Sequence, residues 1–286
     1  MGLKAHLKNY INHLLYLAGF ADVHDMNLEK SFREIIAKSK NPLSRIDLST
    51  SYFSQVDEDA ILEAILERIG WPSQSNPGTF VELGVGNGTE NNTLLLAARG
   101  WQGFWFGGQE ISFNTHSAFR NKLEFYKCWI TQETLKEVII PKILKINNLD
   151  VLSLDLDGND WHFCRSLLES GVQPKVWIQE YNATFPPDVD WCMVYDEKHK
   201  WDLTSYFGAS LLAFVKLFDR FGYRLVACNV TGANAFFIKN EFSTNFSDVP
   251  ESVSDLYMPS RPWLYRARKK IDGRAMSGFN FKIHEF

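Results

Sequence analysis

The sequence has few of the features that mark secreted or membrane-embedded proteins. Its four cysteines are scattered, with no C-x-x-C pair among Cys128, Cys164, Cys192 and Cys228. Cysteines of this kind are typical of reduced thiols in a cytosolic protein. The apolar run LLYLAGFA near the N-terminus is too short to cross a bilayer. We therefore expect a cytoplasmic protein without stable membrane insertion.

An excess of positive charge is also missing. There are 30 lysines and arginines against 34 aspartates and glutamates, for a formal net charge of −4. This balance gives no indication of a nucleic-acid partner. Aromatic residues are plentiful at 14% of the 286 residues, which suits a large core or a pocket for ring-shaped ligands. The protein could also form a homo-oligomer, and its composition is compatible with one.

Apolar strands alternate with helices from residue 79 onward. The strands are expected near 79–86, 101–108, 126–131, 149–158 and 174–182, with two more in 223–239. Helices are expected between them, including 89–100, 113–125 and a segment that breaks at Pro141. This order predicts an α/β fold: a mostly parallel sheet with an antiparallel edge strand, flanked by helices. We expect an N-terminal helical cap (1–72), a core (73–242) and a C-terminal extension (243–286).

A glycine-rich loop follows the first predicted strand in FVELGVGNGTENNT, residues 80–93. Glycines at this point allow a tight turn and a close approach of the backbone to a ligand. The spacing is G-x-G-x-G, whereas a dinucleotide fingerprint requires G-x-G-x-x-G, and no Gly-Lys-Ser/Thr follows as in a phosphate-binding loop. A nicotinamide-dependent enzyme is therefore disfavoured.

The acid two residues before the first glycine completes the pattern E-x-G-x-G-x-G. That pattern resembles class I S-adenosylmethionine-dependent methyltransferases. The order of the later segments GWQGFWFGG, DVLSLDLDGNDWH, PKVWIQEYNATFPP and YFGAS resembles the FkbM-like family of these enzymes over roughly residues 52–240. The resemblance implies a Rossmann-like methyltransferase fold and S-adenosyl-L-methionine as cofactor.

The resemblance also assigns roles to residues of the glycine loop. Glu82 would help to hold the methionine end of the cofactor, and Gly84, Gly86 and Gly88 would make room for it. The second strand departs from the family, because Gly107 stands where an acid usually binds the ribose hydroxyls. Glu110, three residues on, is the candidate replacement. Tyr52 and Gln55 are expected from the family pattern to cover the cofactor.

Acidic residues gather where the fourth and fifth strands end. Asp155 and Asp157 lie on the same side of the fourth strand, because side chains alternate with a period of two. The carboxyl ends of parallel strands share one edge of the sheet, where Glu180 and Asn182 would join them. Carboxylates this close raise one another's pKa unless something positive lies between them.

Three explanations for this charge stay open. The cofactor's ammonium and sulfonium can balance it, with Asp155 as a cofactor contact. Asp155, Glu180 and Asn182 are also oxygen ligands that suit Mg²⁺, an arrangement that resembles catechol-type O-methyltransferases. The third explanation is proton transfer, with Asp157 as general base. His162 is the other candidate base, and Asp160 is a candidate helix cap.

The sequence as a whole predicts S-adenosylmethionine-dependent O-methylation of a hydroxyl on a sugar or secondary metabolite, in biosynthesis. The partner would be a small-molecule or saccharide acceptor. Trp191, Tyr195 and Trp201 follow the fifth strand and are candidates to contact it. Two alternatives remain: N-methylation of a small molecule, and a binding protein that keeps the fold but has lost catalysis, which Gly107 favours.

Overall fold

The computed structural model describes residues 31–45, 53–70, 77–261 and 264. Tyr52, the N-terminal apolar run and most of the predicted loop before the first strand lie outside these ranges. Contacts divide the chain into residues 1–38 with 261–286, and residues 39–260. These limits differ from the predicted domains, because 39–72 and 243–260 belong to the same unit as the core. In the smaller unit a helix covers 31–38.

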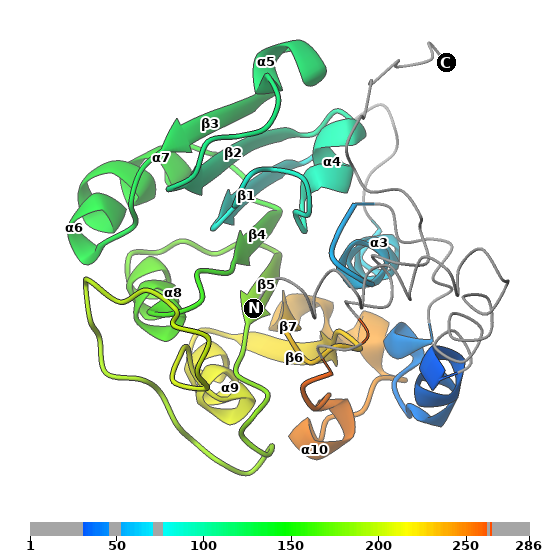
Figure 1. The fold of residues 1–286 in the computed structure, drawn as a ribbon. Helices are drawn as coiled ribbons and strands as arrows, with labels where there is room; N and C mark the ends of the chain where they lie inside the picture. Colours follow the sequence, from blue (N-terminus) through cyan, green and yellow to red (C-terminus); the bar gives the residue numbers. More distant parts are fainter. Residues whose placement is uncertain (1–30, 46–52, 71–76, 262–263, 265–286) are drawn as a thin grey trace, which may run out of the picture. The chain divides into compact units, whose positions relative to one another are not determined.

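A seven-stranded sheet forms the centre of the larger unit, in the order β3-β2-β1-β4-β5-β7-β6 (Figure 1). Six strands run in the same direction, and β7, which pairs with both β5 and β6, runs antiparallel to them. The predicted mostly parallel sheet with an antiparallel edge is therefore confirmed. The strands are β1 (Thr79–Leu83), β2 (Gln102–Gly107), β3 (Leu123–Lys127), β4 (Val151–Leu154), β5 (Val176–Glu180), β6 (Tyr223–Cys228) and β7 (Asn234–Lys239).

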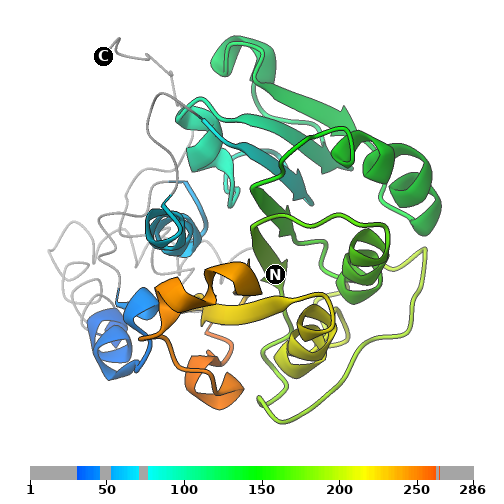
Figure 2. The ribbon, with the colours of Figure 1, turned by 180° about the vertical axis from the view of Figure 1, so that it is seen from behind.

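Helices cover both faces of this sheet. Figures 1 and 2 show α8 (Asp160–Glu169) and α9 (Leu211–Asp219) on one face, and α3 (Glu58–Arg68) and α4 (Leu94–Ala98) on the other. The central strands are consequently buried on both sides, and most residues of β4 and β5 are apolar. The remaining elements are η1 (Pro42–Ser44), α5 (Thr115–Ala118), α6 (Gln132–Thr134), η3 (Leu135–Ile139), α7 (Ile140–Ile143), η4 (Asn240–Phe246) and α10 (Val253–Leu256).

Several predicted elements differ from the structure. The helix predicted over 89–100 is shorter, because residues 84–93 form the turn that leads into α4. The third strand is Leu123–Lys127 rather than 126–131, and the helix predicted over 113–125 is reduced to α5. Pro141 does not end the helical segment, because α6, η3 and α7 follow one another without a gap over 132–143. Proline lacks the N–H that a regular α-helix needs at an interior position, and the π-helical turn η3 directly before α7 changes the hydrogen-bond pattern there.

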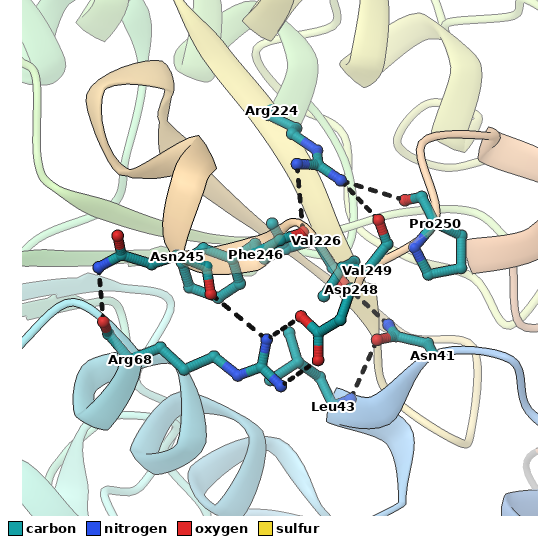
Figure 3. A network of polar contacts seen from close by, with 10 residues as sticks. All are labelled: Asn41, Leu43, Arg68, Arg224, Val226, Asn245, Phe246, Asp248, Val249 and Pro250. Carbon is teal, nitrogen blue, oxygen red and sulfur yellow. Dashed lines mark hydrogen bonds and ion pairs between the residues drawn. The ribbon is translucent and has the colours of Figure 1, made fainter.

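Two arginines fasten the segment 240–250 to the sheet and to α3 (Figure 3). Arg224 of β6 donates to the carbonyls of Phe246 at 3.4 Å and Val249 at 2.7 Å. Arg68, at the end of α3, makes a two-pronged ion pair with Asp248, with N···O distances of 2.6 and 3.0 Å. These contacts make residues beyond 242 part of the core unit.

The four cysteines are unpaired, as the sequence predicted: Cys164 and Cys228 are buried, and Cys128 and Cys192 are half-buried. Within the described ranges, we find no helix that combines the length and apolar character needed to cross a membrane.

Candidate cofactor site

A cavity of about 530 Å³ opens at the carboxyl ends of β1, β2 and β4. This volume lies in the range of small-molecule sites, roughly 300–1,000 Å³. In the sheet order, β1 leads outward to β2 and β3 on one side, while β4 and β5 lie on the other. The strand order reverses between β1 and β4, and open α/β sheets bind ligands in the crevice at this point. Its lining includes Gln55, Glu82, Gly84, Gly86, Gly107, Gln109, Trp129, Asp155, Asp157, His199, Lys200 and Trp201.

The glycine loop brings the ends of β1 and β4 into contact. Gly84 has a φ of +95°, and a Cβ atom there would lie 1.6 Å from the carbonyl oxygen of Asp155. Only glycine allows this approach, because any side chain would overlap the neighbouring backbone. Gly84 and Gly86 both line the cavity. Gly88 does not line it: a Cβ atom at Gly88 would lie 3.1 Å from the side chain of Ile111.

Glu82, at the end of β1, holds the start of α4. Its carboxylate accepts hydrogen bonds from the backbone N–H groups of Asn92 and Thr93, both at 3.1 Å, and from the Thr93 hydroxyl at 2.5 Å. Trp105 Nε1 donates to the same hydroxyl at 2.9 Å. Burial raises the pKa of Glu82, and the hydrogen bonds from Thr93 and Asn92 oppose that shift. Glu82 therefore lines the cavity and also supports its wall.

At the end of β2 the structure changes the predicted ribose contact. Glu110 does not line the cavity: its side chain is 79% exposed and forms an ion pair with Lys127. Gly107 and Gly108 form the wall instead, and Gln109 follows them. The amide of Gln109 can donate to and accept from hydroxyl groups. Gln109 is therefore a polar residue of this segment that lines the cavity, whereas Glu110 does not.

The residues after β4 form a tight turn that Asp160 holds in place. The buried carboxylate of Asp160 accepts from the backbone N–H groups of Leu156 and Gly158, both at 2.8 Å. Asp157, between them, takes a left-handed backbone with a φ of +54°. Aspartate and asparagine tolerate this conformation better than most residues. Asp160 thus fixes the turn that carries Asp157 as well as beginning α8.

Three carboxylates of the cavity edge meet at this turn. Asp155, Asp157 and Glu180 offer oxygen atoms that all lie within 4.8 Å of one another. Burial raises the pKa of Asp155 and of Glu180 well above the usual range, and the charges of neighbouring carboxylates raise both further. Burial raises the pKa of Asp157 as well. The acidic residues Asp155, Asp157 and Glu180 therefore lie together at this edge, and the pKa of each carboxyl is above its ordinary value.

Asn182 is not a member of this group, and the predicted metal ligand set is corrected accordingly. Its amide nitrogen donates to the carbonyls of Ser205 and Phe207, both at 2.9 Å, and its oxygen accepts from Thr184. With Asp157 in its place, the donor set is three carboxylates, which suits Mg²⁺ in chemistry. Acidic groups also gather without a metal, so Mg²⁺ stays a prediction.

The two histidines of this region have different surroundings. His162, the predicted base, does not line the cavity: its Nε2 lies 2.9 Å from the carbonyl of Met193 and its ring packs edge-on to Tyr195. This placement indicates a residue that anchors the following loop. His199 lines the cavity instead, and its Nε2 is buried with no hydrogen-bond partner among the described residues. Sequence reasoning missed it because the loop around it has no regular pattern.

Of the loop aromatics predicted to contact an acceptor, one lines the cavity. Trp201 does so, whereas Trp191 stacks on Phe185 with ring centroids 4.5 Å apart and Tyr195 packs on His162. Of the two residues predicted to cover the cofactor, Tyr52 lies outside the described residues and Gln55 lines the cavity.

The carboxyl groups of the site predict an unusual dependence of stability on pH. Burial raises the pKa of Asp160 from 3.8 to about 6, and the pKa values of Glu82, Asp155 and Glu180 are raised as well. The folded protein therefore holds protons that the unfolded chain releases. For Asp160 this stabilisation is full below about pH 4 and is lost as the pH rises through about 6. The pKa of Asp248 is shifted in the opposite direction, because Arg68 lowers it. Its effect on stability therefore changes only at a lower pH, below the ordinary pKa of an aspartate.

We therefore expect the ligand-free protein to unfold at higher urea concentration at pH 5 than at pH 7.5. Asp160 alone contributes roughly 1–2 kcal/mol to the difference. Asp160→Asn should reduce the difference, since asparagine does not titrate. A free energy of unfolding that falls between pH 7.5 and pH 5 would contradict the raised pKa values.

The strand order and the antiparallel β7 are those of the Rossmann-like class I methyltransferase fold. No family model matches the sequence, and no curated protein matches it. Among solved structures, an O-methyltransferase family protein from Burkholderia thailandensis is 12% identical, with a TM-score of 0.37, over 77% of this chain and 70% of that one. A TehB-like SAM-dependent methyltransferase from Corynebacterium glutamicum is also 12% identical, with a TM-score of 0.37, over 76% and 99%. Human N-acetylserotonin methyltransferase is 13% identical, with a TM-score of 0.33, over 74% and 66%.

Proposed function

We propose that this chain transfers the methyl group of S-adenosylmethionine to a small-molecule acceptor. The observation that carries the proposal is the cavity at the reversal point between β1 and β4, lined by Glu82, Gly84 and Asp155. It combines a close backbone approach with carboxylates, which suit a cofactor that carries a sulfonium and an ammonium. The segments that resemble the FkbM-like family supply these residues, which supports membership of that family.

Individual residues of the cavity suit different parts of this cofactor. The wall at Gly84 and Gly86 has no side chains, so the cofactor can lie against the backbone there. Glu82 and Asp155 lie at the ends of the adjacent strands β1 and β4 and would attract the positive groups. Gln109 would contact the ribose hydroxyls. A neutral amide in place of an acid gives up a charge-assisted hydrogen bond of about 1.5–3 kcal/mol.

The bound cofactor supplies an activated methyl group, and the chain's contribution is positioning. Methyl transfer is an in-line displacement, so holding the acceptor atom opposite the sulfur accounts for much of the rate. Asp157, a carboxylate that lines the cavity, would take a proton from the acceptor. Oxygen and nitrogen acceptors both satisfy this chemistry, and the sequence predicted oxygen.

Calorimetry with the full chain tests the proposal. We expect S-adenosylmethionine and S-adenosylhomocysteine to bind one molecule per chain, with dissociation constants below about 100 µM, or about −5.5 kcal/mol. Titrations with Mg²⁺ and with EDTA should be run in parallel to test the predicted metal. Folded protein that binds neither compound at millimolar concentration would rule out the methyltransferase function.

A second candidate is a binding protein that keeps the fold without catalysis. Gly107 and the outward position of Glu110 favour it, because they remove the usual acidic ribose contact. The test is methyl transfer to acceptors that bind the cavity. If the protein binds S-adenosylhomocysteine but methylates none of these acceptors, the second candidate is favoured.

A further inference from the structure

Buried polar atoms that lack a hydrogen-bond partner gather at the cofactor cavity. In the described part of the chain, five side-chain nitrogen or oxygen atoms are buried in this way. Three of them belong to residues that line the cavity: Asn91 Oδ1, Asn234 Oδ1 and His199 Nε2. Native proteins hold few such atoms, because a buried polar group without a partner is destabilising. Their concentration at one cavity indicates atoms whose partner is a ligand.

Asn91 presents an oxygen that can only accept a hydrogen bond. The residue lies in the turn between β1 and α4 and is 4% exposed. Its Nδ2 donates to the carbonyl of Val85 at 3.2 Å. Burial raises the pKa of Glu82, and a hydrogen bond from the Asn91 side chain is among the contacts that oppose this shift. These contacts fix which end of the amide is the oxygen, because a reversed amide would place its oxygen against other oxygen atoms.

Glu82, which the family resemblance assigns to the methionine end of the cofactor, has little capacity left to accept a hydrogen bond. An ionised carboxylate offers about four lone-pair sites. The backbone N–H groups of Asn92 and Thr93 and the Thr93 hydroxyl occupy three of them. The Asn91 side chain lies against the same carboxylate. The Asn91 oxygen is therefore an unused acceptor on the side chain next to Glu82.

The ligand group that fits this oxygen is a positively charged donor. S-adenosylmethionine has three kinds of N–H or O–H donor: its ammonium, its ribose hydroxyls and its adenine amino group. Of these, only the ammonium gains from an acidic neighbour such as Glu82, and charged hydrogen bonds are roughly twice as strong as neutral ones. The ribose is already proposed at Gln109, which follows β2, whereas Asn91 follows β1.

We propose that Asn91 Oδ1, rather than the Glu82 carboxylate, accepts a hydrogen bond from the ammonium at the methionine end of the cofactor. This inference rests on the proposed methyltransferase function and adds a binding residue to it. Neither residue spacing nor the family resemblance assigned a role to Asn91.

Two ligands that differ only in the amino group test the proposal. S-adenosylhomocysteine carries this group, and 4-(5′-deoxyadenosin-5′-ylthio)butanoate lacks it. The full chain is titrated with each ligand by calorimetry. We expect the unchanged protein to bind S-adenosylhomocysteine about tenfold more tightly or better, since the second ligand leaves the Asn91 oxygen without a partner. Equal binding of the two ligands would overturn the proposal.

Asn91→Leu removes the acceptor and keeps the branched shape of the side chain. It should weaken S-adenosylhomocysteine by about tenfold and leave the ligand without the amino group within about twofold, so the preference falls by that factor. Asn234→Leu is the matched control. Asn234 is also buried, carries an unpartnered Oδ1 and lines the same cavity, but it lies on β7. This variant should keep the preference, and losing it there instead of at Asn91 would contradict the assignment.

A crystal structure of the unchanged protein with S-adenosylhomocysteine gives a second measurement, which does not depend on how well a variant folds. We expect the amino nitrogen of the ligand to lie about 2.7–3.2 Å from Asn91 Oδ1. An amino nitrogen that bonds to the Glu82 carboxylate instead, or that makes no contact with Asn91, would overturn the proposal.

The outcomes distinguish this inference from the function on which it rests. If the unchanged protein binds neither ligand, the methyltransferase function fails and the role of Asn91 fails with it. If S-adenosylhomocysteine binds but Asn91→Leu leaves the preference for the amino group unchanged, only the role of Asn91 is overturned.

Discussion

Gly84→Ala is expected to abolish cofactor binding and to lower the free energy of unfolding by about 2–5 kcal/mol. Two costs add. A non-glycine residue at a φ of +95° is strained by roughly 1–2 kcal/mol. The added Cβ would also lie 1.6 Å from the carbonyl oxygen of Asp155, and moving a backbone apart in a packed region costs typically about 1–3 kcal/mol. Because that movement separates the ends of β1 and β4, the cavity between them changes shape.

Urea unfolding and calorimetry with S-adenosylhomocysteine measure the two effects. Gly171→Ala is the matched control, because Gly171 has a φ of +86° and no atom within 4 Å of an added Cβ. It should show the backbone strain alone and keep cofactor binding, since it lies outside the cavity. Equal losses of stability in the two variants would show that the approach to Asp155 is not the cause.

Glu82→Ala is expected to lower the free energy of unfolding by about 3–5 kcal/mol and to prevent cofactor binding. The substitution leaves two backbone N–H groups and the Thr93 hydroxyl without their acceptor in a buried place. Each unsatisfied buried group costs about 1–3 kcal/mol, less any gain from water that enters. The turn before α4 would loosen, and it forms one wall of the cavity.

Glu82→Gln separates the support from the charge. Glutamine fills the same volume and accepts through one oxygen, so the loss of stability should be about half that of alanine. It should still weaken S-adenosylmethionine binding at least tenfold, or about 1.4 kcal/mol, because the carboxylate's charge is gone. Circular dichroism and calorimetry on both variants check this. A glutamine variant that binds as well as the unchanged protein would show that Glu82 is only structural.

Much of the fold could be predicted because its signals are local. The buried strands β4 and β5 are apolar runs between polar turns, and segments of helical periodicity lie between strands. The prediction was wrong where short elements depend on their surroundings. Residues 89–93 have no strong preference of their own, and the hydrogen bonds to Glu82 hold Asn92 and Thr93 in the turn before α4. The third strand pairs with β2 at Leu123, earlier than its composition indicated.

The candidate site divides in the same way. Glu82, Gly84, Gly86, Asp155 and Asp157 line one cavity, as their places at the ends of neighbouring strands predict. Glu110, His162 and Asn182 turned out to be engaged elsewhere, by Lys127, by Met193 and by the backbone of the loop after β5. Neither a lysine seventeen residues away nor a carbonyl across a loop can be read from residue spacing.

The sequence by itself determined the class of fold and the edge of the sheet where the cavity opens. Strand periodicity and glycine position are local properties, and parallel strands necessarily end at a common edge. Only the tertiary structure decided which side chains reach the cavity. Long loops pack by contacts between distant residues, and these brought His199 and Trp201 to the site while turning Glu110 outward. The physical reason is that side-chain direction in an irregular loop depends on its packing partners rather than on its own pattern.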